Sequence, residues 1–306
     1  MRTPMNLKLG SRKSALALWQ THHVADLLRA AHPGLTVEIV TMDTLGDLRT
    51  DVPLPAIGAK GLFTQELEAA LASDAIDLAV HSLKDLPSTL PEGMKFAGSP
   101  RRASPLDAFI STRYASFDEV PDGATIATGS QRRKAQLLHR RPNLTFADLR
   151  GNIGTRLEKL EREGFDGIIM AHAALERLEM GDRVTSALPA DQYVPAVGQG
   201  AIGLESRIGR DDIDALIAPI LDEATMRAVT AERIFMRRLE GGCSVALGAY
   251  CEPAEAPGQW VFHAWVSSTD GQQCLHESRT GEEPDQLANA LVDDFLERGA
   301  RSILRA

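Results

Sequence analysis

The sequence predicts an α/β protein with two lobes and a small α+β domain at its C-terminal end. Within the first 200 residues, two successive units each alternate apolar strand patterns with helix patterns. Such alternation is typical of largely parallel sheets covered by helices on both faces. After residue 242, strand patterns with a period of two are grouped ahead of a single helix, as in an α+β domain. With 306 residues, the chain is long enough for two or three domains, each with its own core.

Strands and helices alternate regularly in the first lobe. We expect strands at 5–9, 35–40 and 75–81 and helices at 14–31 and 63–73. Ser14 and Thr64 lie where the two helices begin, and their hydroxyl groups are suited to accept hydrogen bonds from the first backbone N–H groups. The last of the three strands is nearly continuous in apolar residues, so it should be covered on both faces.

The second lobe repeats this alternation. We expect strands at 107–111, 124–128 and 144–149, helices at 131–141 and 155–163, and a strand running into a helix at 165–175. A stretch rich in Pro and Gly follows at 189–203. Its composition is that of a crossover or hinge.

The C-terminal part starts with a helix pattern at 222–240 that ends at the C-cap signal Gly241–Gly242. Strand patterns follow at 244–252, 259–269 and 273–280, ahead of a final helix at 284–298. Asp270–Gly271 predicts the hairpin turn between the last two strands.

Charge and cysteine content exclude several classes of protein. The 42 acidic residues outnumber the 33 Lys and Arg, for a net charge of −9, which argues against a general affinity for nucleic acid. A local basic pocket for a small anion remains compatible with this charge. The three cysteines, Cys243, Cys251 and Cys274, form no C-x-x-C pair, so we expect neither a disulfide framework nor a metal site. With no signal-peptide pattern and no apolar run of about 18 residues, we expect a soluble, cytoplasmic protein without a membrane partner.

The string G-x-G-x-x-G occurs at Gly198, Gly200 and Gly203. A dinucleotide fingerprint requires a strand before it and a helix directly after it. Here Pro195 precedes the string and Ala201–Leu204 looks like a strand. We therefore favour an interdomain crossover over a dinucleotide site.

Cationic residues follow the ends of several predicted strands. They are Arg12, Lys13, Lys84, Arg132, Arg133 and Arg150, with Arg156 at the next helix start. In open α/β sheets the carboxyl ends of the strands share one edge, and ligands bind there. Helix N-termini add N–H donors at the same edge. The pattern predicts a polyanionic ligand held by guanidinium groups, although each residue alone also fits an ordinary loop surface.

Two further residues have alternative interpretations. Asp85 follows an apolar strand and is either an ion-pair partner or a group that stabilises a cation or transfers a proton. Cys243 follows two glycines and is either a buried apolar filler or an accessible, modified thiol. His81 is expected to be a hydrogen-bonded residue at the core edge.

These residues lie in stretches that resemble hydroxymethylbilane synthase, also called porphobilinogen deaminase, over nearly the whole chain. Eight stretches match in the family's order: LGSRKSALALWQ, GDLRTDVPL, GAKGLFTQELE, DLAVHSLKDLP, GSQRRKAQLLHRRP, LRGNIGTRLEKL, PAVGQGAIGLE and TAERIFMRRLEGGC. Eight blocks in order are far more specific than any single motif.

The resemblance implies an activity, a cofactor and a fold. The family joins four porphobilinogen units head to tail with loss of ammonia and releases the linear tetrapyrrole hydroxymethylbilane. It builds this chain on a dipyrromethane cofactor held by a thioether to a cysteine. Its fold resembles two type II periplasmic-binding-protein lobes plus a third domain that carries the cysteine, which here implies domains at 1–100 with 200–218, 105–195 and 222–306. The resemblance also suggests a monomer.

The resemblance also implies roles for individual residues. Cys243 in LEGGC matches the cofactor attachment point, and Asp85 in HSLKD matches the catalytic carboxylate. The cofactor contacts are Lys84, Ser130, Arg132, Arg133, Arg150 and Arg156; the substrate contacts are Arg12, Ser14, Arg177 and Gln199; Lys60 and Phe63 fall in the loop over the active site. Each pyrrole carries an acetate and a propionate, which agrees with the many arginines.

The sequence departs from the family at two positions. Ala56 stands where several bacterial relatives have a second loop lysine, and Gly129 stands where a serine pair is common. Neither change removes a residue that the chemistry requires, so we expect activity. Two other functions compete with this one: an anion-binding module without catalysis, and a thiol enzyme that uses Cys243 as its nucleophile, for which no Cys/His signature is visible.

Overall fold

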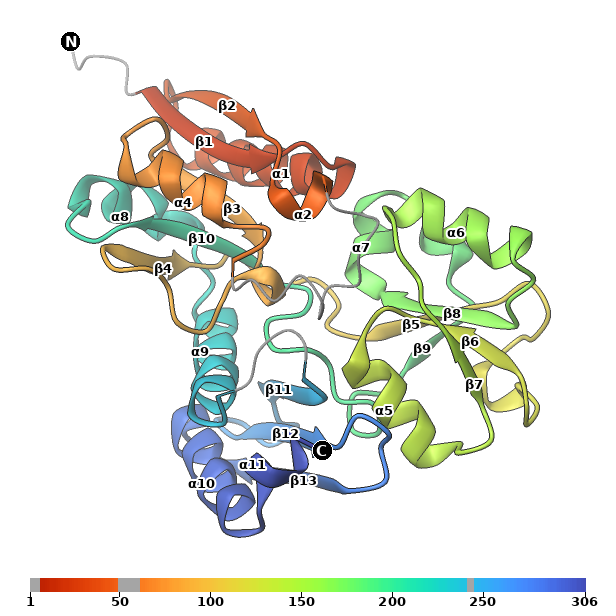
Figure 1. Ribbon diagram of the computed structural model, residues 1–306. Coiled ribbons are helices and arrows are strands. Elements are labelled where there is room, and N and C mark those ends of the chain that lie inside the picture. Colours follow the sequence, from red (N-terminus) through yellow and green to blue (C-terminus); the bar gives the residue numbers. More distant parts are fainter. Residues whose placement is uncertain (1–5, 49–60, 241–244) are drawn as a thin grey trace. The chain divides into compact units, whose positions relative to one another are not determined.

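The computed structural model describes residues 6–48, 61–240 and 245–306, which fold as two compact units (Figure 1). Unit 1 comprises Met1–Ala103 and Ala201–Met226, and unit 2 comprises Ser104–Gly200 and Arg227–Ala306. The chain therefore passes from unit 2 back to unit 1 after Gly200. The division into three domains expected from the sequence stays a prediction.

Unit 1 is built on a five-stranded sheet with the order β2-β1-β3-β10-β4. Its strands are β1 (Asn6–Arg12), β2 (Thr36–Met42), β3 (Leu78–Ser82), β4 (Met94–Gly98) and β10 (Ile202–Arg207); its helices are α1 (Ala15–Ala31), α2 (Leu45–Leu48), α4 (Gln65–Ala72) and α8 (Asp211–Ile217), with short 3₁₀ turns at η1 (Leu83–Asp85) and η4 (Ala218–Ile220). β1 runs parallel to β2 and β3, whereas β10 is antiparallel to β3 and β4.

Both faces of this sheet are covered, as the apolar strand pattern predicts. Leu78 and Val80 of β3 pack in one core with residues of α1 and α8, and Ala79 packs in another with residues of α4. Alternate side chains of a strand point to opposite faces, so the strand needs a helix on each side. Burial on both faces therefore explains the nearly continuous apolar run.

The two predicted helix caps have different outcomes. Ser14 caps α1 as expected, since its hydroxyl accepts a hydrogen bond from the N–H of Ala17 at 3.3 Å. The expected cap at Thr64 is wrong, because its side chain makes no capping hydrogen bond to α4. Its backbone is not extended (φ −127°, ψ −23°), whereas a capping side chain requires an extended backbone, and its hydroxyl points toward the carbonyl of Gly61 at 3.5 Å.

The second lobe, in unit 2, has a sheet with the order β7-β6-β8-β5-β9. Its elements are β5 (Asp107–Ile110), β6 (Thr125–Ala127), β7 (Thr145–Ala147), β8 (Gly167–Ala171), β9 (Ser186–Leu188), α5 (Gln131–Arg140), α6 (Ile153–Arg162), α7 (His172–Arg177), η2 (Phe117–Glu119) and η3 (Gly181–Arg183). β6 is parallel to β7 and β8, and β5 is antiparallel to β8 and β9. Each sheet thus has three parallel strands, one antiparallel strand and a further edge strand beside it.

The rest of unit 2 is a three-stranded antiparallel sheet with helices. It consists of α9 (Glu223–Arg238), β11 (Leu247–Pro253), β12 (Trp260–Ser267), β13 (Cys274–Gly281), α10 (Pro284–Glu297) and α11 (Ala300–Ile303). Phe235, Phe262 and Phe295 are fully buried and pack edge-on or tilted against one another. With the two lobes, this domain confirms the predicted fold class of two periplasmic-binding-protein-like α/β lobes plus a small α+β domain.

Two short strands, β4 and β9, were not predicted from the sequence. β4 and β9 both lie at the edge of a sheet, and β9 has only three residues. In β4 the alternation of apolar and polar residues is limited to Met94–Lys95–Phe96, and β9 is too short to show one. The expected turn at Asp270–Gly271 lies in the connection between β12 and β13, and Gly271 has a φ of +72°, which favours glycine.

Candidate ligand-binding and catalytic site

Asp85 lies at the end of a strand that unit 1 holds firmly. The turn η1 continues directly from β3, and its first residue, Leu83, is buried. The N–H of Leu83 donates to the carbonyl of Ala201 at 3.0 Å, which fixes the turn beside the start of β10. Lys84 and Asp85 complete the turn, and the Asp85 side chain is 34% exposed. The fold thus presents a carboxylate at the edge of the sheet.

Arg12 lies next to Asp85, as expected for residues at the carboxyl ends of neighbouring parallel strands. Nη1 of Arg12 is 3.9 Å from Oδ2 of Asp85. The guanidinium group also lies over the ring of Phe63, 4.3 Å from its centroid, a favourable cation–π geometry. The ring of Phe63 packs against Gly46, which has no side chain; a Cβ at this position would lie 2.1 Å from the ring.

His81 and Glu205 form a buried pair behind this edge. Nε2 of His81 lies 2.8 Å from Oε2 of Glu205, and both side chains are at most 2% exposed. Burial raises the pKa of the nearby carboxyl group of Glu68, and the negative charge of Glu205 contributes in the same direction. The hydrogen-bonded core histidine expected from the sequence is confirmed.

In unit 2, three residues predicted to contact a ligand converge on Asp107. Oδ2 of Asp107 is 2.8 Å from Nη1 of Arg132, and Oδ1 accepts hydrogen bonds from Nε of Arg133 at 2.9 Å and Nε2 of Gln199 at 2.8 Å. The carboxylate, both arginines and the amide are buried. Ser130 caps α5 by accepting a long hydrogen bond, 3.4 Å, from the N–H of Arg133.

The charges in this cluster shift its pKa values. Burial alone would raise the pKa of Asp107, but the charges of Arg132 and Arg133 outweigh it and hold that pKa well below its usual range. Burial also lowers the pKa of the Arg133 guanidinium, and Asp107 opposes this effect. In both groups the ion pair favours the charged forms.

Arg177 lies at the end of α7 and is also buried. Its Nη2 donates to the carbonyl of Gly200 at 2.7 Å, and burial lowers its pKa to about 10. The residues Gln199–Gly200 therefore contact both Arg133 and Arg177. The string G-x-G-x-x-G leads into strand β10 rather than a helix, which confirms the crossover interpretation and rules out the dinucleotide alternative.

Arg150 and Arg156 lie between β7 and the first turns of α6. Arg156 donates through Nε to the carbonyl of Gly151 at 2.8 Å, and Asn152 caps the helix through the N–H of Thr155 at 2.9 Å. Nε of Arg150 is 3.5 Å from Oδ2 of Asp148, too far for a strong hydrogen bond. Its side chain is 22% exposed, and its Nε is buried without a hydrogen-bond partner among the described residues.

Some predicted site residues lie outside the described residues, and one functional candidate was missed. Cys243, Lys60 and the departure at Ala56 fall in stretches that the structure does not describe. Asp107 was not singled out, because a single acid at the start of the apolar strand DAFI resembles an ordinary strand end. Its arginine partners, 25 and 26 residues away, leave no local spacing signal.

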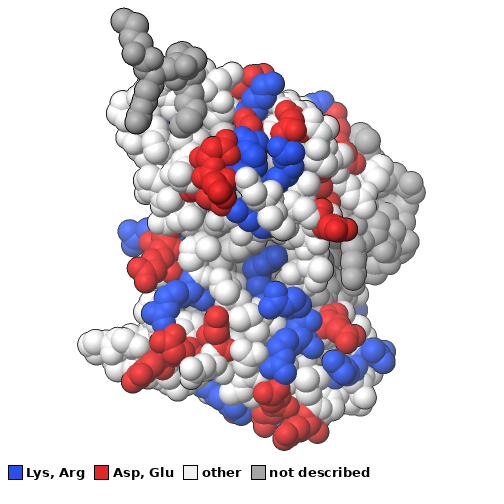
Figure 2. Space-filling view, turned by 90° about the vertical axis from the view of Figure 1, so that its left-hand side faces the viewer, with Lys and Arg blue, Asp and Glu red and all other residues white. Residues whose placement is uncertain are grey.

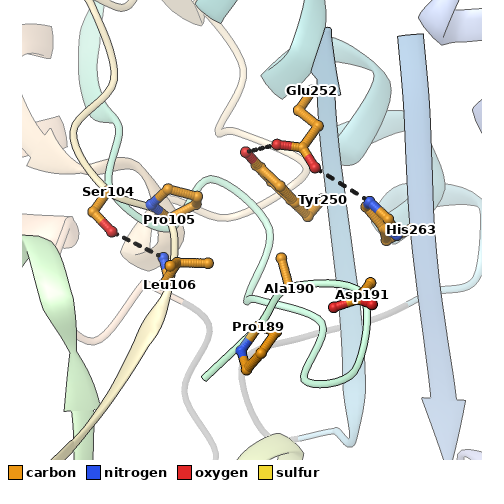
Figure 3. Close-up of a pocket in the computed structure, with 9 residues that line it drawn as sticks. All are labelled: Ser104, Pro105, Leu106, Pro189, Ala190, Asp191, Tyr250, Glu252 and His263. Carbon is orange, nitrogen blue, oxygen red and sulfur yellow. Dashed lines mark hydrogen bonds and ion pairs between the residues drawn. The ribbon is translucent and has the colours of Figure 1, made fainter. Parts of the chain in front are cut away.

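Unit 2 also contains a cavity of about 420 Å³ that none of the predicted site residues lines (Figure 3). On one side, the hydroxyl group of Tyr250 donates to Oε2 of Glu252 at 2.8 Å, and His263 lies 3.4 Å from Oε1 of the same carboxylate. The opposite walls come from Ser104–Leu106 and Pro189–Asp191. Tyr250, Glu252 and His263 are thus joined through the Glu252 carboxylate.

Acidic and basic side chains are interspersed on the face in Figure 2. Ion pairs join acidic and basic side chains in both units; for example, Arg210 pairs with Asp77 and Asp212, and Arg298 pairs with Glu277 and Asp294. Several basic side chains lie next to one another in the lower half of this face.

No group of three or more His, Cys, Asp or Glu in the described part of the chain could hold a metal ion. None of the described helices is long and apolar enough to span a membrane.

Two family models match the chain in succession. The model described as "Porphobilinogen deaminase, dipyromethane cofactor binding domain" matches residues 7–215, and "Porphobilinogen deaminase, C-terminal domain" matches residues 226–297. Together they span both units.

Solved structures with a similar fold have low sequence identity. A putative methionine-binding lipoprotein from Bacillus subtilis is 13% identical, with 72% of this chain and 92% of that chain covered and a TM-score of 0.42. A periplasmic substrate-binding protein of an ABC transporter from Coxiella burnetii is 13% identical, with 72% and 93% covered and a TM-score of 0.44.

Proposed function

The chain belongs to the porphobilinogen deaminase family, and from this premise we propose that it condenses four porphobilinogen molecules head to tail into hydroxymethylbilane. Ammonia is released at each addition, and hydrolysis frees the linear tetrapyrrole. The observation that carries the proposal is the match of both family models, in order, over residues 7–215 and 226–297. We further propose that the enzyme acts in the cytoplasm as a monomer.

We propose dipyrromethane as the cofactor, attached by a thioether to Cys243. When bound, it supplies the pyrrole carbon to which the first substrate is joined. The residues of the second lobe fit such a group, because its acetate and propionate side chains are anions. The buried cluster pairs two guanidinium groups with one carboxylate, and Nε of Arg132 is buried without a hydrogen-bond partner among the described residues. Ser130, Arg132, Arg133, Arg150 and Arg156, with Lys84 of the first lobe, would hold it.

Asp85 is proposed as the catalytic carboxylate. Loss of ammonia from the aminomethyl group of porphobilinogen leaves an azafulvenium cation on the substrate, with its positive charge spread over the pyrrole ring. A fixed carboxylate stabilises this cation and can accept the pyrrole N–H proton. The short turn η1 supports this role, because it limits the movement of Asp85 through the bond from Leu83 to Ala201.

The substrate carboxylates need cationic and neutral donors. We propose that Arg12, Ser14, Arg177 and Gln199 bind them, and that the loop with Lys60 and Phe63 covers the site. Arg12 lies beside Asp85 and over the ring of Phe63, so one residue links the loop to the proposed catalytic carboxylate. Arginine is suited to this task because its forked donors match a carboxylate.

The intact mass of the denatured protein tests the proposal, with Cys243→Ala beside the wild type and Cys274→Ala as the matched control. An excess equal to two linked pyrrole units in the wild type and in Cys274→Ala, absent from Cys243→Ala, is the expected result. If the wild type has only the mass of the unmodified chain, it is incubated with porphobilinogen and its mass is measured again. If the second mass is also bare and no bilane forms, the proposal is wrong.

Alkylation separates this function from a thiol enzyme. A thioether at Cys243 blocks labelling in the native and in the unfolded protein, whereas a nucleophilic thiol reacts in both. Active enzyme with a readily alkylated Cys243 would rule out the covalent cofactor.

A further inference from the structure

We propose that Asp107 is a positioning residue: its buried carboxylate fixes the guanidinium groups of Arg132 and Arg133 for the ligand without contacting the ligand itself. The inference rests on the proposed function, because it concerns the arginines proposed to hold the cofactor. No sequence pattern indicates this role for Asp107.

Arg132 and Arg133 are neighbours in the first turn of α5, yet both side chains are buried, at 4% and 8% exposure. Two like charges in a buried place repel each other and lose their hydration. Asp107, at 1% exposure on β5, supplies the opposite charge at 2.8 Å from both guanidinium groups. The two arginines therefore stay charged and buried because this carboxylate lies between them.

The contacts fix orientation as well as charge. Arg132 engages both oxygens of Asp107, through Nη1 to Oδ2 at 2.8 Å and Nη2 to Oδ1 at 3.2 Å. Arg133 donates to Oδ1 through Nε, and its Nη2 donates to Oε1 of Gln199 at 3.2 Å. Gln199 in turn donates to Oδ1 of Asp107. This closed network holds each planar guanidinium group in one plane.

The network leaves binding capacity for an anion. Two guanidinium cations and one carboxylate leave one net positive charge in the buried cluster. Nε of Arg132 has no hydrogen-bond partner among the described residues although it is buried, and leaving a buried donor unpaired is unfavourable. A ligand carboxylate would satisfy both the charge and the donor, which is the chemistry of the proposed cofactor's side chains.

The test replaces the charge with an isosteric amide, Asp107→Asn, and measures thermal unfolding, the fraction of protein carrying the pyrrole adduct, and kcat and KM per loaded molecule. We expect a folded protein whose adduct fraction or kcat/KM falls at least tenfold. The loss should persist in protein that stays folded at the assay temperature. A role in stability alone predicts a lower unfolding temperature with an unchanged adduct fraction and kcat/KM in the folded protein.

Asp166→Asn is the matched control. Asp166 also pairs with an arginine of the second lobe, Arg113, at 2.7 Å, and accepts the N–H of Thr125, but no proposed ligand contact belongs to this group. The control should lower the unfolding temperature and leave the adduct, kcat and KM unchanged. If Asp107→Asn behaves in the same way, the positioning role is wrong.

If Asp107→Asn does not fold, Asp107→Glu is used instead, because it keeps the charge and displaces it by one methylene. Unchanged kcat, KM and adduct fraction in a folded Asp107→Glu would overturn the proposal. A lower kcat/KM or adduct fraction would support it. If the wild type itself has neither adduct nor activity after incubation with porphobilinogen, the proposed function fails. A wild type with both, beside an unimpaired Asp107→Asn, rejects the positioning role alone.

Discussion

Nη1 of Arg12 lies 3.9 Å from Oδ2 of Asp85, at adjacent strand ends of one sheet. This distance is at the limit of an ion pair, and the Asp85 side chain remains one-third exposed. At such exposure, the pair itself adds little to stability, at most about 1 kcal/mol. Under the proposed function, the contribution of Asp85 is expected in the reaction, where its carboxylate would face the positive charge that forms on the substrate.

Asp85→Asn should therefore fold normally and lose turnover. The amide keeps the shape of the side chain but not the charge, and removing a fixed group that stabilises a developing charge costs roughly 100- to 1,000-fold in kcat. Steady-state release of ammonia from porphobilinogen measures this loss. Asp43→Asn, which removes the carboxylate of an exposed pair with Lys13, is the control and should retain kcat; near-normal turnover of Asp85→Asn would contradict the assigned role.

Asp222 should stabilise the start of α9 in a pH-dependent way. Its Oδ1 accepts the N–H of Thr225 at 2.8 Å, and hydrogen bonds from Thr225 hold the pKa of Asp222 below its usual value. A carboxyl group with a lowered folded-state pKa stabilises the protein above its unfolded pKa of about 3.9, and this stabilisation is lost as the pH falls toward the folded-state pKa. Asp222→Ala should cost about 1 kcal/mol at neutral pH and less in acid.

Urea unfolding of the wild type and Asp222→Ala from pH 7 to pH 3 measures this difference. Asp26→Ala, which removes an exposed pair with Arg29 in α1, should change stability by at most about 0.5 kcal/mol. A difference for Asp222→Ala that stays constant down to pH 3 would show that the charge of the cap is unimportant.

The strand ends that carry Arg12 and Asp85 follow from local sequence patterns. Apolar runs identify β1 and β3 as strands of a largely parallel sheet whose carboxyl ends share an edge, whereas their adjacency, and with it the contact, is seen only in the structure. The cap at Ser14 is equally local, since the serine directly precedes α1. Thr64 shows the limit of this reasoning, because a cap depends on backbone angles as well as residue type.

The cluster around Asp107 could not be predicted in this way. Its members come from β5, α5 and the crossover at Gln199, and only the folded sheet brings them together. Sequence patterns report which residues lie on one element, whereas a buried ion pair depends on distant elements and on their register. The roles of Cys243 and Asp85 likewise came from resemblance to a family rather than from composition or spacing.

Arg150 is expected to bind a ligand rather than to stabilise the lobe. Its only ion pair given by the described residues, with Asp148, is 3.5 Å long, so Arg150→Ala should change the unfolding temperature little. Loss of a charge-assisted contact worth about 1.5–3 kcal/mol would lower kcat/KM by roughly 10- to 150-fold. Arg150→Lys should recover part of this loss, since it restores the charge without the fork.

Mass spectrometry of the enzyme after brief exposure to porphobilinogen should show at which addition Arg150→Ala stalls. Arg113→Ala, which removes a half-exposed arginine paired with Asp166, is the control and should elongate normally. If Arg150→Ala elongates like this control, Arg150 has a structural role only.

The contact between the C-terminal domain and α5 depends on Gly271. This residue has a φ of +72°, and a Cβ there would lie 2.4 Å from the carbonyl oxygen of Ala135. Gly258 has a similar φ of +76° but open space around it, so Gly258→Ala should cost only the left-handed conformation, about 1–2 kcal/mol. Gly271→Ala should cost about 1–3 kcal/mol more, because the loop must also move away from the helix.

Thermal unfolding of the two variants isolates the effect of the contact, since both carry the same backbone strain. α5 also carries Arg132 and Arg133, so displacement of this helix should raise KM or lower the adduct fraction in Gly271→Ala and not in Gly258→Ala. Equal losses of stability in the two variants would mean that the loop with Gly271 can move away from Ala135 without a further cost in stability. Normal binding in a destabilised Gly271→Ala would instead show that Asp107 fixes the arginines without support from the C-terminal domain.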